Sequence, residues 1–121
     1  MIDRRTIPAL LLLAAMAPPA AADDAKVGQK IAEEHCSRCH VIGDYNKFGG
    51  IGSTPSFNAI KYLDDWRDRF QTFFLRRPHP AFVQVEGYPP PTDLEPYATP
   101  VILKPAAVTD ILAFVETLKA R

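Results

Sequence analysis

Proline is distributed unevenly along this 121-residue chain, and that distribution limits the fold more than any other feature. Of the 12 prolines, eight lie in the segment from Pro78 to Pro105. Proline fixes φ and cannot donate a backbone hydrogen bond, so this segment cannot form one long helix or a central strand. We therefore expect a long, extended, proline-rich loop here, with regular structure before and after it.

Residues 1–22 have the pattern of a secretory signal peptide. Arg4 and Arg5 precede an apolar run from Ile7 to Ala17, and three alanines follow at positions 20–22. The run is shorter than the roughly 20 residues that a membrane-spanning helix needs. We predict that residues 1–22 are removed, and that residues 23–121 form one domain in the periplasm with no stable membrane span. A retained N-terminal anchor is the alternative.

Charge and cysteine content exclude other classes of protein. The 14 Lys and Arg residues balance the 14 Asp and Glu residues, so there is no basic excess for binding nucleic acid. A hydrophobic content of 47% is typical of a globular chain rather than a disordered one. Two cysteines cannot form a disulfide scaffold, since they allow at most one bridge.

The periodicity of apolar residues predicts an all-α domain. Asp23 or Asp24, Ser56 and Pro105 stand where helices or turns are expected to begin. Three short helices in a mature chain of this size give a thin core, so we expect something other than side chains to fill the centre. The predicted helical segments are residues 25–38, 63–75 and 105–119, with a short turn at 57–62.

Residues 36–40 read Cys-Ser-Arg-Cys-His, a C-x-x-C-H motif that uses both cysteines of the chain. In this spacing each thiol can add to one vinyl group of a haem, and the next residue can bind the iron from below. The motif therefore predicts one covalent haem c on Cys36 and Cys39, with His40 as the proximal iron ligand.

Two other uses of these residues are possible. A redox-active disulfide between Cys36 and Cys39 would call for a thioredoxin-like βαβ pattern, which the sequence lacks. A zinc site would need Cys36, Cys39, His40 and either His35 or His79, but no second ligand pair with zinc spacing occurs.

With this motif, residues 24–121 resemble the small monohaem class I c-type cytochromes of the bacterial periplasm. Gly28 matches the small residue where the N- and C-terminal helices of the family cross, and Phe114 matches the aromatic residue that packs there. Pro55 matches a proline whose carbonyl orients the proximal imidazole. The resemblance implies a cytochrome c-like fold of three or more short helices around the haem.

The sequence departs from this family at the sixth iron ligand. In such cytochromes a methionine shortly after a Pro-His pair usually binds the iron, but Phe82 stands at that position after Pro78-His79. Residues 23–121 contain no methionine. Either His79 binds the iron, or the iron is open or water-bound behind a distal wall formed by Phe82. Another loop residue is the remaining possibility: Lys104, Tyr88 or Tyr97.

The resemblance implies a periplasmic carrier of single electrons rather than an enzyme. Its partners would be periplasmic redox proteins. An imidazole in place of the methionine is expected to lower the reduction potential. Two other functions remain open: a haem-based binder or sensor of CO or NO with an open distal site, and the electron-accepting subunit of a periplasmic dehydrogenase that docks through the proline-rich loop.

Overall fold

The computed structural model describes residues 23–93, 95 and 99–120. The predicted signal peptide, residues 1–22, lies outside the described residues. The described elements are, in chain order, α1 (Ala25–His35), α2 (Phe57–Lys61), α3 (Trp66–Thr72), the 3-10 turns η1 (Phe73–Leu75) and η2 (His79–Ala81), β1 (Val83–Val85), β2 (Val101–Leu103) and α4 (Pro105–Thr117).

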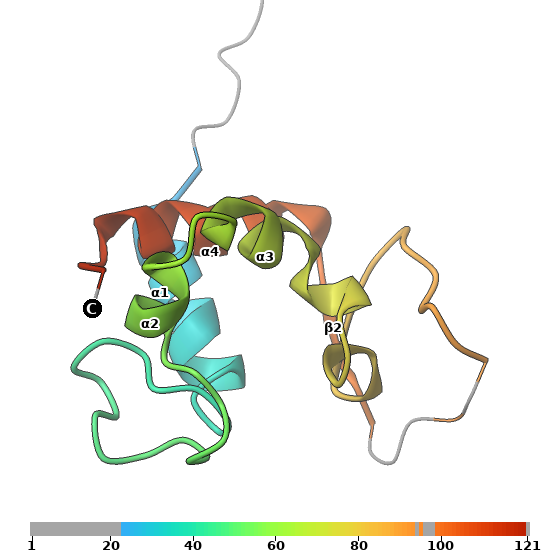
Figure 1. Cartoon of the computed structure of the whole chain (residues 1–121). Coiled ribbons are helices and arrows are strands. Elements are labelled where there is room, and N and C mark those ends of the chain that lie inside the picture. The colour runs from blue at the N-terminus through green and yellow to red at the C-terminus, as the bar shows by residue number, and fades with distance from the viewer. Residues whose placement is uncertain (1–22, 94, 96–98, 121) are drawn as a thin grey trace, which may run out of the picture.

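The first and last helices cross and pack against each other. In Figure 1, α4 runs along the top of the molecule and α1 passes behind it and descends. Gly28 lies at the crossing, where the backbone of α4 at Asp110 and Ile111 leaves no room for a side chain. The close approach expected for Gly28 is thus present, and it brings the end of α1 to a fixed place under α4.

Local signals explain where the helices begin. The Asp24 carboxylate caps α1 by accepting from the backbone N–H groups of Lys26 and Val27. The Ser56 hydroxyl caps α2 by accepting from Ala59 at 3.0 Å. Pro105 occupies the first position of α4, where a helix tolerates proline.

Two helices are shorter than their apolar patterns indicate. α1 ends at His35 rather than near residue 38, so the C-x-x-C-H motif lies in the turns that follow the helix. The segment predicted as a helix over residues 63–75 is helical only from Trp66 to Thr72 and then tightens into η1. The Thr72 hydroxyl donates to the Asp68 carbonyl at 2.7 Å, a local bond that accompanies this change of helix type.

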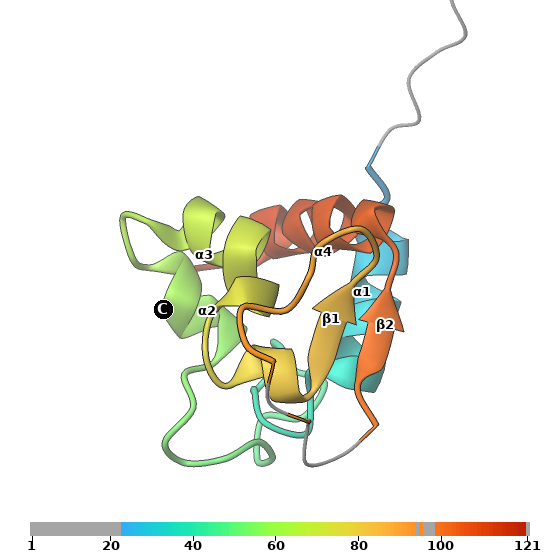
Figure 2. The same ribbon diagram turned by 90° about the vertical axis from the view of Figure 1, so that its right-hand side faces the viewer.

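The prediction of an all-α domain needs a correction, because the described residues also contain two short strands. β1 and β2 pair in parallel, with Val83 opposite Val101 and Val85 opposite Leu103 (Figure 2). The prolines between positions 89 and 100 lie outside both strands, so they exclude a long strand but not two strands of three residues. The fold remains mostly helical, with little strand.

The core lies where α1, α3, α4 and the small sheet meet. The buried apolar side chains of the core are Ala32, Ile42, Phe57, Phe70, Phe74, Val83, Val85, Leu103, Ala107, Val108, Ile111, Phe114 and Val115.

Among the described residues no helix is long and apolar enough to cross a membrane.

Candidate functional site

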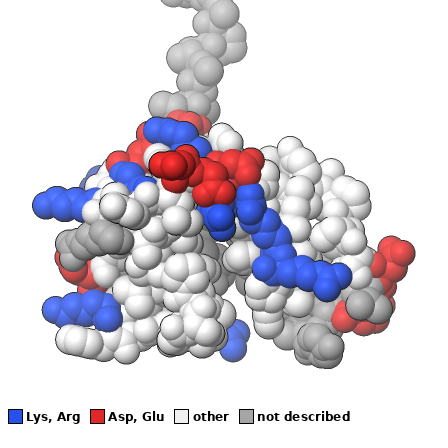
Figure 3. Space-filling view, in the orientation of Figure 1, with Lys and Arg blue, Asp and Glu red and all other residues white. Residues whose placement is uncertain are grey.

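A cavity of about 420 Å³ opens between the C-x-x-C-H segment, α3 and the turns that follow α3. Its walls are mostly apolar, with side chains such as Phe57, Phe70 and Ile111. Its size is within the range of sites that bind cofactors or drug-sized ligands. Figure 3 shows this face hollowed between two largely uncharged masses, with both basic and acidic side chains along the upper part.

Both cysteines of the motif line this cavity, and no disulfide joins them. They follow the end of α1, where the Cys36 N–H donates to Ala32 and the His40 N–H donates to Cys36. Burial, together with the neighbouring Cys39, raises the pKa of the Cys36 thiol to about 12. A free thiol at this position would therefore be neutral at neutral pH, unlike the activated nucleophile of a redox-active disulfide.

The His40 ring lines the same cavity from the side of the motif. Its Nδ1 lies 2.7 Å from the carbonyl oxygen of Pro55, so the hydrogen bond that the resemblance implies is present. The edge of the Phe57 ring packs near it, with ring centres 5.4 Å apart. With Nδ1–H donating to Pro55, the other nitrogen, Nε2, carries no proton and can bind a metal.

The His79 ring lines the opposite wall and has nearly the same surroundings. Its Nδ1 lies 2.9 Å from the carbonyl oxygen of Arg76, and the Phe73 ring packs against it with centres 5.6 Å apart. Nε2 of His79 is thereby also left as an unprotonated nitrogen. The two histidines, 39 positions apart in the sequence, present the same chemistry to one cavity.

The two imidazole rings are parallel within 1°, and their centres are 6.0 Å apart. Two imidazoles that bind one metal ion from opposite sides, through bonds of about 2 Å, have ring centres about 6 Å apart. Burial lowers the pKa of His40 and of His79, more than the hydrogen bonds to Pro55 and Arg76 raise them. Both rings are thus neutral at neutral pH, as metal ligands must be.

The lining of the cavity matches the requirements of a haem. A porphyrin needs an apolar slot, two thiols at one edge for covalent attachment, and one or two neutral imidazoles facing its centre. The cavity supplies all three: apolar walls, Cys36 and Cys39, and the pair His40 and His79. The residues present therefore fit a covalent haem.

Asn46 holds the loop after the motif, and no pattern in the sequence indicates this role. Its Oδ1 accepts from the N–H of Ile42 at 2.7 Å, and its Nδ2 donates to the carbonyls of Ser37 and His40 at 3.0 and 2.9 Å. This one side chain ties both ends of the motif to the following loop, which carries the chain on to Pro55. The aromatic neighbours of the two imidazoles, Phe57 and Phe73, were likewise visible only as apolar positions.

The other candidate residues lie in different places. Phe82 lines the cavity but its side chain is about half exposed, at 48%. Lys104 and Tyr88 are not among the residues that line the cavity, and Tyr97 lies outside the described residues. Within the described chain no group of three or more His, Cys, Asp or Glu side chains could hold a metal ion, so the zinc hypothesis gains no support.

Together, the C-x-x-C-H turn, the paired imidazoles and the helices around them define a haem-binding protein of the c type. The family model for cytochrome c matches residues 25–119, and the chain therefore belongs to the cytochrome c family. This family binds a covalently attached haem c, and its members are in general electron carriers. Comparisons with curated proteins and with solved structures gave no significant match.

Proposed function

We propose that this protein is a periplasmic monohaem carrier of single electrons with two histidine ligands. In this proposal Cys36 and Cys39 hold the haem covalently, His40 binds the iron on one side and His79 binds it on the other. Membership of the cytochrome c family supports a haem-containing electron-transfer protein. The single observation that carries the finer proposal is the parallel arrangement of the two imidazoles with ring centres 6.0 Å apart.

The surrounding residues would keep this site fixed during electron transfer. When bound, the haem iron takes up and releases one electron by changing between its ferric and ferrous states. The carbonyls of Pro55 and Arg76 hold the two imidazoles in one tautomer and one orientation, which limits rearrangement between the two states. Ligation by His79 instead of a thioether would give a low reduction potential.

Two histidine ligands also favour a carrier over a sensor. A binder of CO or NO needs a vacant position on the iron, and a second imidazole, parallel to His40 with its ring centre 6.0 Å away, would fill that position. Phe82 also lines the cavity and would act as a partial shield of the iron.

The location and the partners form a further part of the proposal. The charge and apolar pattern of residues 1–22 supports export to the periplasm. The partners would be periplasmic redox proteins or a dehydrogenase. Intact-mass measurement of the exported protein tests both export and attachment: we expect a chain that begins near Asp23 and carries the mass of one haem. Free thiols, or a retained N-terminal segment, would contradict the corresponding part of the proposal.

The decisive experiment compares His79→Ala with His35→Ala in the haem-loaded protein. His35 also lines the cavity, with its side chain 27% exposed, but it directly precedes the attachment motif. Its partial burial makes it a strict control. We expect sharp low-spin bands, unchanged by CO, in the wild type and in His35→Ala.

His79→Ala should produce a high-spin haem that binds CO. A wild-type protein that is already high-spin and binds CO rapidly would favour the alternative function as a ligand binder. Low-spin bands that survive His79→Ala would remove His79 from the proposal.

A further inference from the structure

Every contact between aromatic or imidazole rings among the described residues lies in one unbranched chain of eight rings. Neighbouring rings have their centres between 4.9 and 6.4 Å apart. Aromatic pairs that pack together have a spacing of about 4.5–7 Å. This ring chain passes through both imidazoles of the site, and its members in order are Trp66, Phe70, Phe57, His40, His79, Phe73, Phe74 and Tyr88.

The ring chain begins and ends at two separate parts of the surface. Trp66 is the first residue of α3 and is only partly buried. Tyr88 lies three residues after β1, and its side chain is 52% exposed. In Figure 2, α2 and α3 lie on the left and the small sheet lies to their right. None of the six rings between the two ends is exposed, so the chain connects two surface regions through the site.

The Trp66 end of the ring chain is held by two cations. The Arg67 guanidinium lies 4.4 Å from the centre of the indole ring, and the Lys61 ammonium lies 5.6 Å from it. Both cations are attached to the end of α4, because Lys61 donates to the carbonyls of Glu116 and Leu118 and Arg67 pairs with the Glu116 carboxylate. A cation over an indole face attracts the ring. The indole is therefore fixed relative to α4.

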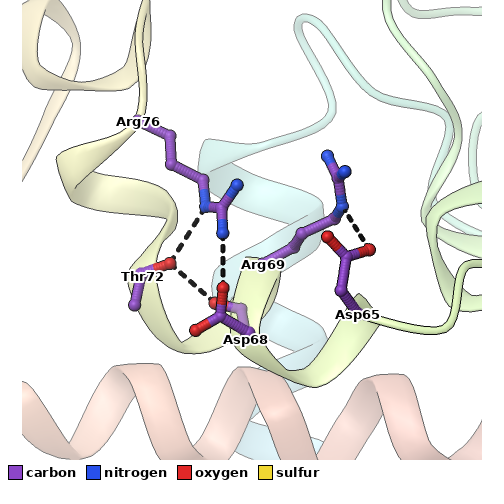
Figure 4. A network of polar contacts seen from close by, with 5 residues as sticks. All are labelled: Asp65, Asp68, Arg69, Thr72 and Arg76. Carbon is purple, nitrogen blue, oxygen red and sulfur yellow. Dashed lines mark hydrogen bonds and ion pairs between the residues drawn. The ribbon is translucent and has the colours of Figure 1, made fainter.

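A polar network joins α3 to η1, the two elements that carry four of the rings. The Nε of Arg76 donates to the Thr72 hydroxyl at 2.9 Å, and its Nη2 donates to the Asp68 carboxylate at 2.5 Å (Figure 4). One turn earlier, the Nε of Arg69 donates to the Asp65 carboxylate at 2.7 Å. These bonds hold η1 against the end of α3, so the rings on the two elements keep their relative positions.

The Tyr88 end of the ring chain is fixed by a turn. The Tyr88 N–H donates to the Val85 carbonyl at 3.1 Å, and Gly87 has a φ of 83°, which glycine adopts easily. The Tyr88 ring packs on Phe74 with centres 5.1 Å apart and planes inclined by 64°. Three prolines follow at positions 89–91 and restrict the backbone beyond the turn. The phenol ring therefore has a defined position on a buried phenyl ring.

We infer that Trp66 and Tyr88 are two separate places where electrons enter and leave this protein, and that the rings between them form the route to the iron. One branch runs from Trp66 to His40 and the other from Tyr88 to His79. The inference rests on the proposed function, and its Tyr88 branch rests on His79 as an iron ligand.

The rings act as a bridge and not as carriers. A haem neither oxidises nor reduces a phenyl ring, so the electron must tunnel past the phenylalanines. Tunnelling weakens more steeply across empty gaps than across packed or bonded atoms, and an unbroken series of packed rings leaves few gaps. One electron from a donor protein makes the ferric iron ferrous, and the ferrous iron later gives one electron to an acceptor protein. No proton moves and no bond breaks. With two separate ends, donor and acceptor can be bound at the same time.

The test measures electron transfer from a photoactive ruthenium label to the haem in the haem-loaded protein. The label is attached to a cysteine introduced by Asp64→Cys or by Glu86→Cys. Each of these acidic residues is exposed, lies two positions before one end of the ring chain, and forms no ion pair with a described residue. Laser flash photolysis gives the rate for each label, and a rate independent of protein concentration shows that the transfer is intramolecular.

The two end variants serve as controls for each other. Trp66→Leu should slow transfer from the label at position 64 several-fold and leave transfer from position 86 at its original rate. Tyr88→Leu should have the reverse effect. Phe48→Leu should change neither rate, because the Phe48 ring is 94% exposed and is not part of the ring chain. Unchanged rates in both end variants would overturn the inference, as would equal slowing of both labels. An effect at one end alone would overturn the branch at the other end.

Conservative variants test whether the ring itself is required. Trp66→Phe and Tyr88→Phe keep a packed ring, so each should restore most of the rate lost in the corresponding leucine variant. Phenylalanine variants as slow as the leucine variants would contradict a bridge of rings. If Trp66→Leu does not retain haem, the two Tyr88 variants decide the question, since the Tyr88 side chain lies largely outside the core.

The spectrum and the reduction potential separate this inference from the proposed iron ligation. Both should stay at their wild-type values in the end variants, because neither Trp66 nor Tyr88 binds the iron. Low-spin bands that survive His79→Ala would overturn the ligation and the Tyr88 branch, while the Trp66 branch would still be decided by the label at position 64. If His79→Ala gives a high-spin haem but no end variant changes a rate, the ligation stands and this inference alone is wrong.

Discussion

The packing of α1 against α4 makes a sharp prediction for Gly28→Ala. In a helix interior this change alone stabilises by about 1 kcal/mol, because alanine has the higher helix propensity. At this crossing, however, the new Cβ would lie 1.9 Å from the carbonyl oxygen of Asp110 and 2.7 Å from the backbone nitrogen of Ile111. Ordinary contacts begin near 3.4 Å, so the two helices must separate by about 1.5 Å.

The clash should outweigh the gain in propensity. Overpacking of a well-filled site costs about 1–3 kcal/mol and sometimes more, and here the opposing atoms are backbone atoms that cannot rotate away. We expect a net loss of about 2 kcal/mol or more in the free energy of unfolding, which corresponds to a fall in Tm of roughly 10 °C for a domain of this size.

The assay is urea and thermal unfolding of the haem-loaded protein, followed by circular dichroism. Gly52→Ala is the matched control: a Cβ at this loop position would meet nothing within 4 Å. Its stability should stay within about 0.5 kcal/mol of the wild type. A Gly28→Ala protein as stable as the wild type, or more stable, would show that the helices do not approach as closely as described.

Two further predictions concern the supports of the site. Asn46→Ala removes three hydrogen bonds around the motif and should lower the free energy of unfolding by about 3 kcal/mol. Asn58→Ala, which removes one exposed bond, should cost less than about 1 kcal/mol in the same urea titration; equal losses would contradict the role of Asn46. Phe73→Leu removes the ring that packs against His79. It should leave the ferric haem low-spin but broaden its electron paramagnetic resonance signal, whereas an unchanged signal would show that the ring does not orient the imidazole.

The sequence predicted a helix boundary correctly where a local signal marks that boundary. Asp24, Ser56 and Pro105 each mark the beginning of a helix through its own side chain or fixed φ, so their helices begin as expected. The ends of α1 and α3 were predicted less well. The helical spacing of apolar residues continues beyond these ends, although the residues there form turns. The strands were missed since three residues are too few to show an alternating pattern.

For the site, the sequence predicted the chemistry but not its geometry. The spacing of Cys36, Cys39 and His40 depends only on neighbouring residues, so the attachment motif can be identified directly from the sequence. The position of His79 depends on how α3, η1 and η2 return the chain to the cavity, and no local pattern encodes that path. Sequence alone therefore left three possibilities open: ligation by His79, an open or water-bound iron, and ligation by another loop residue.

The turn η2 explains how a histidine could serve where the family usually has a methionine three residues later. The Phe82 N–H donates to the His79 carbonyl at 2.8 Å, which closes a 3-10 turn between them. In such a turn, residues i and i+3 lie above one another on the same side of the chain. Side chains at positions 79 and 82 therefore approach the cavity from the same side, and both line it. A phenyl ring at position 82 cannot bind iron, whereas the imidazole one turn earlier would be able to take this role.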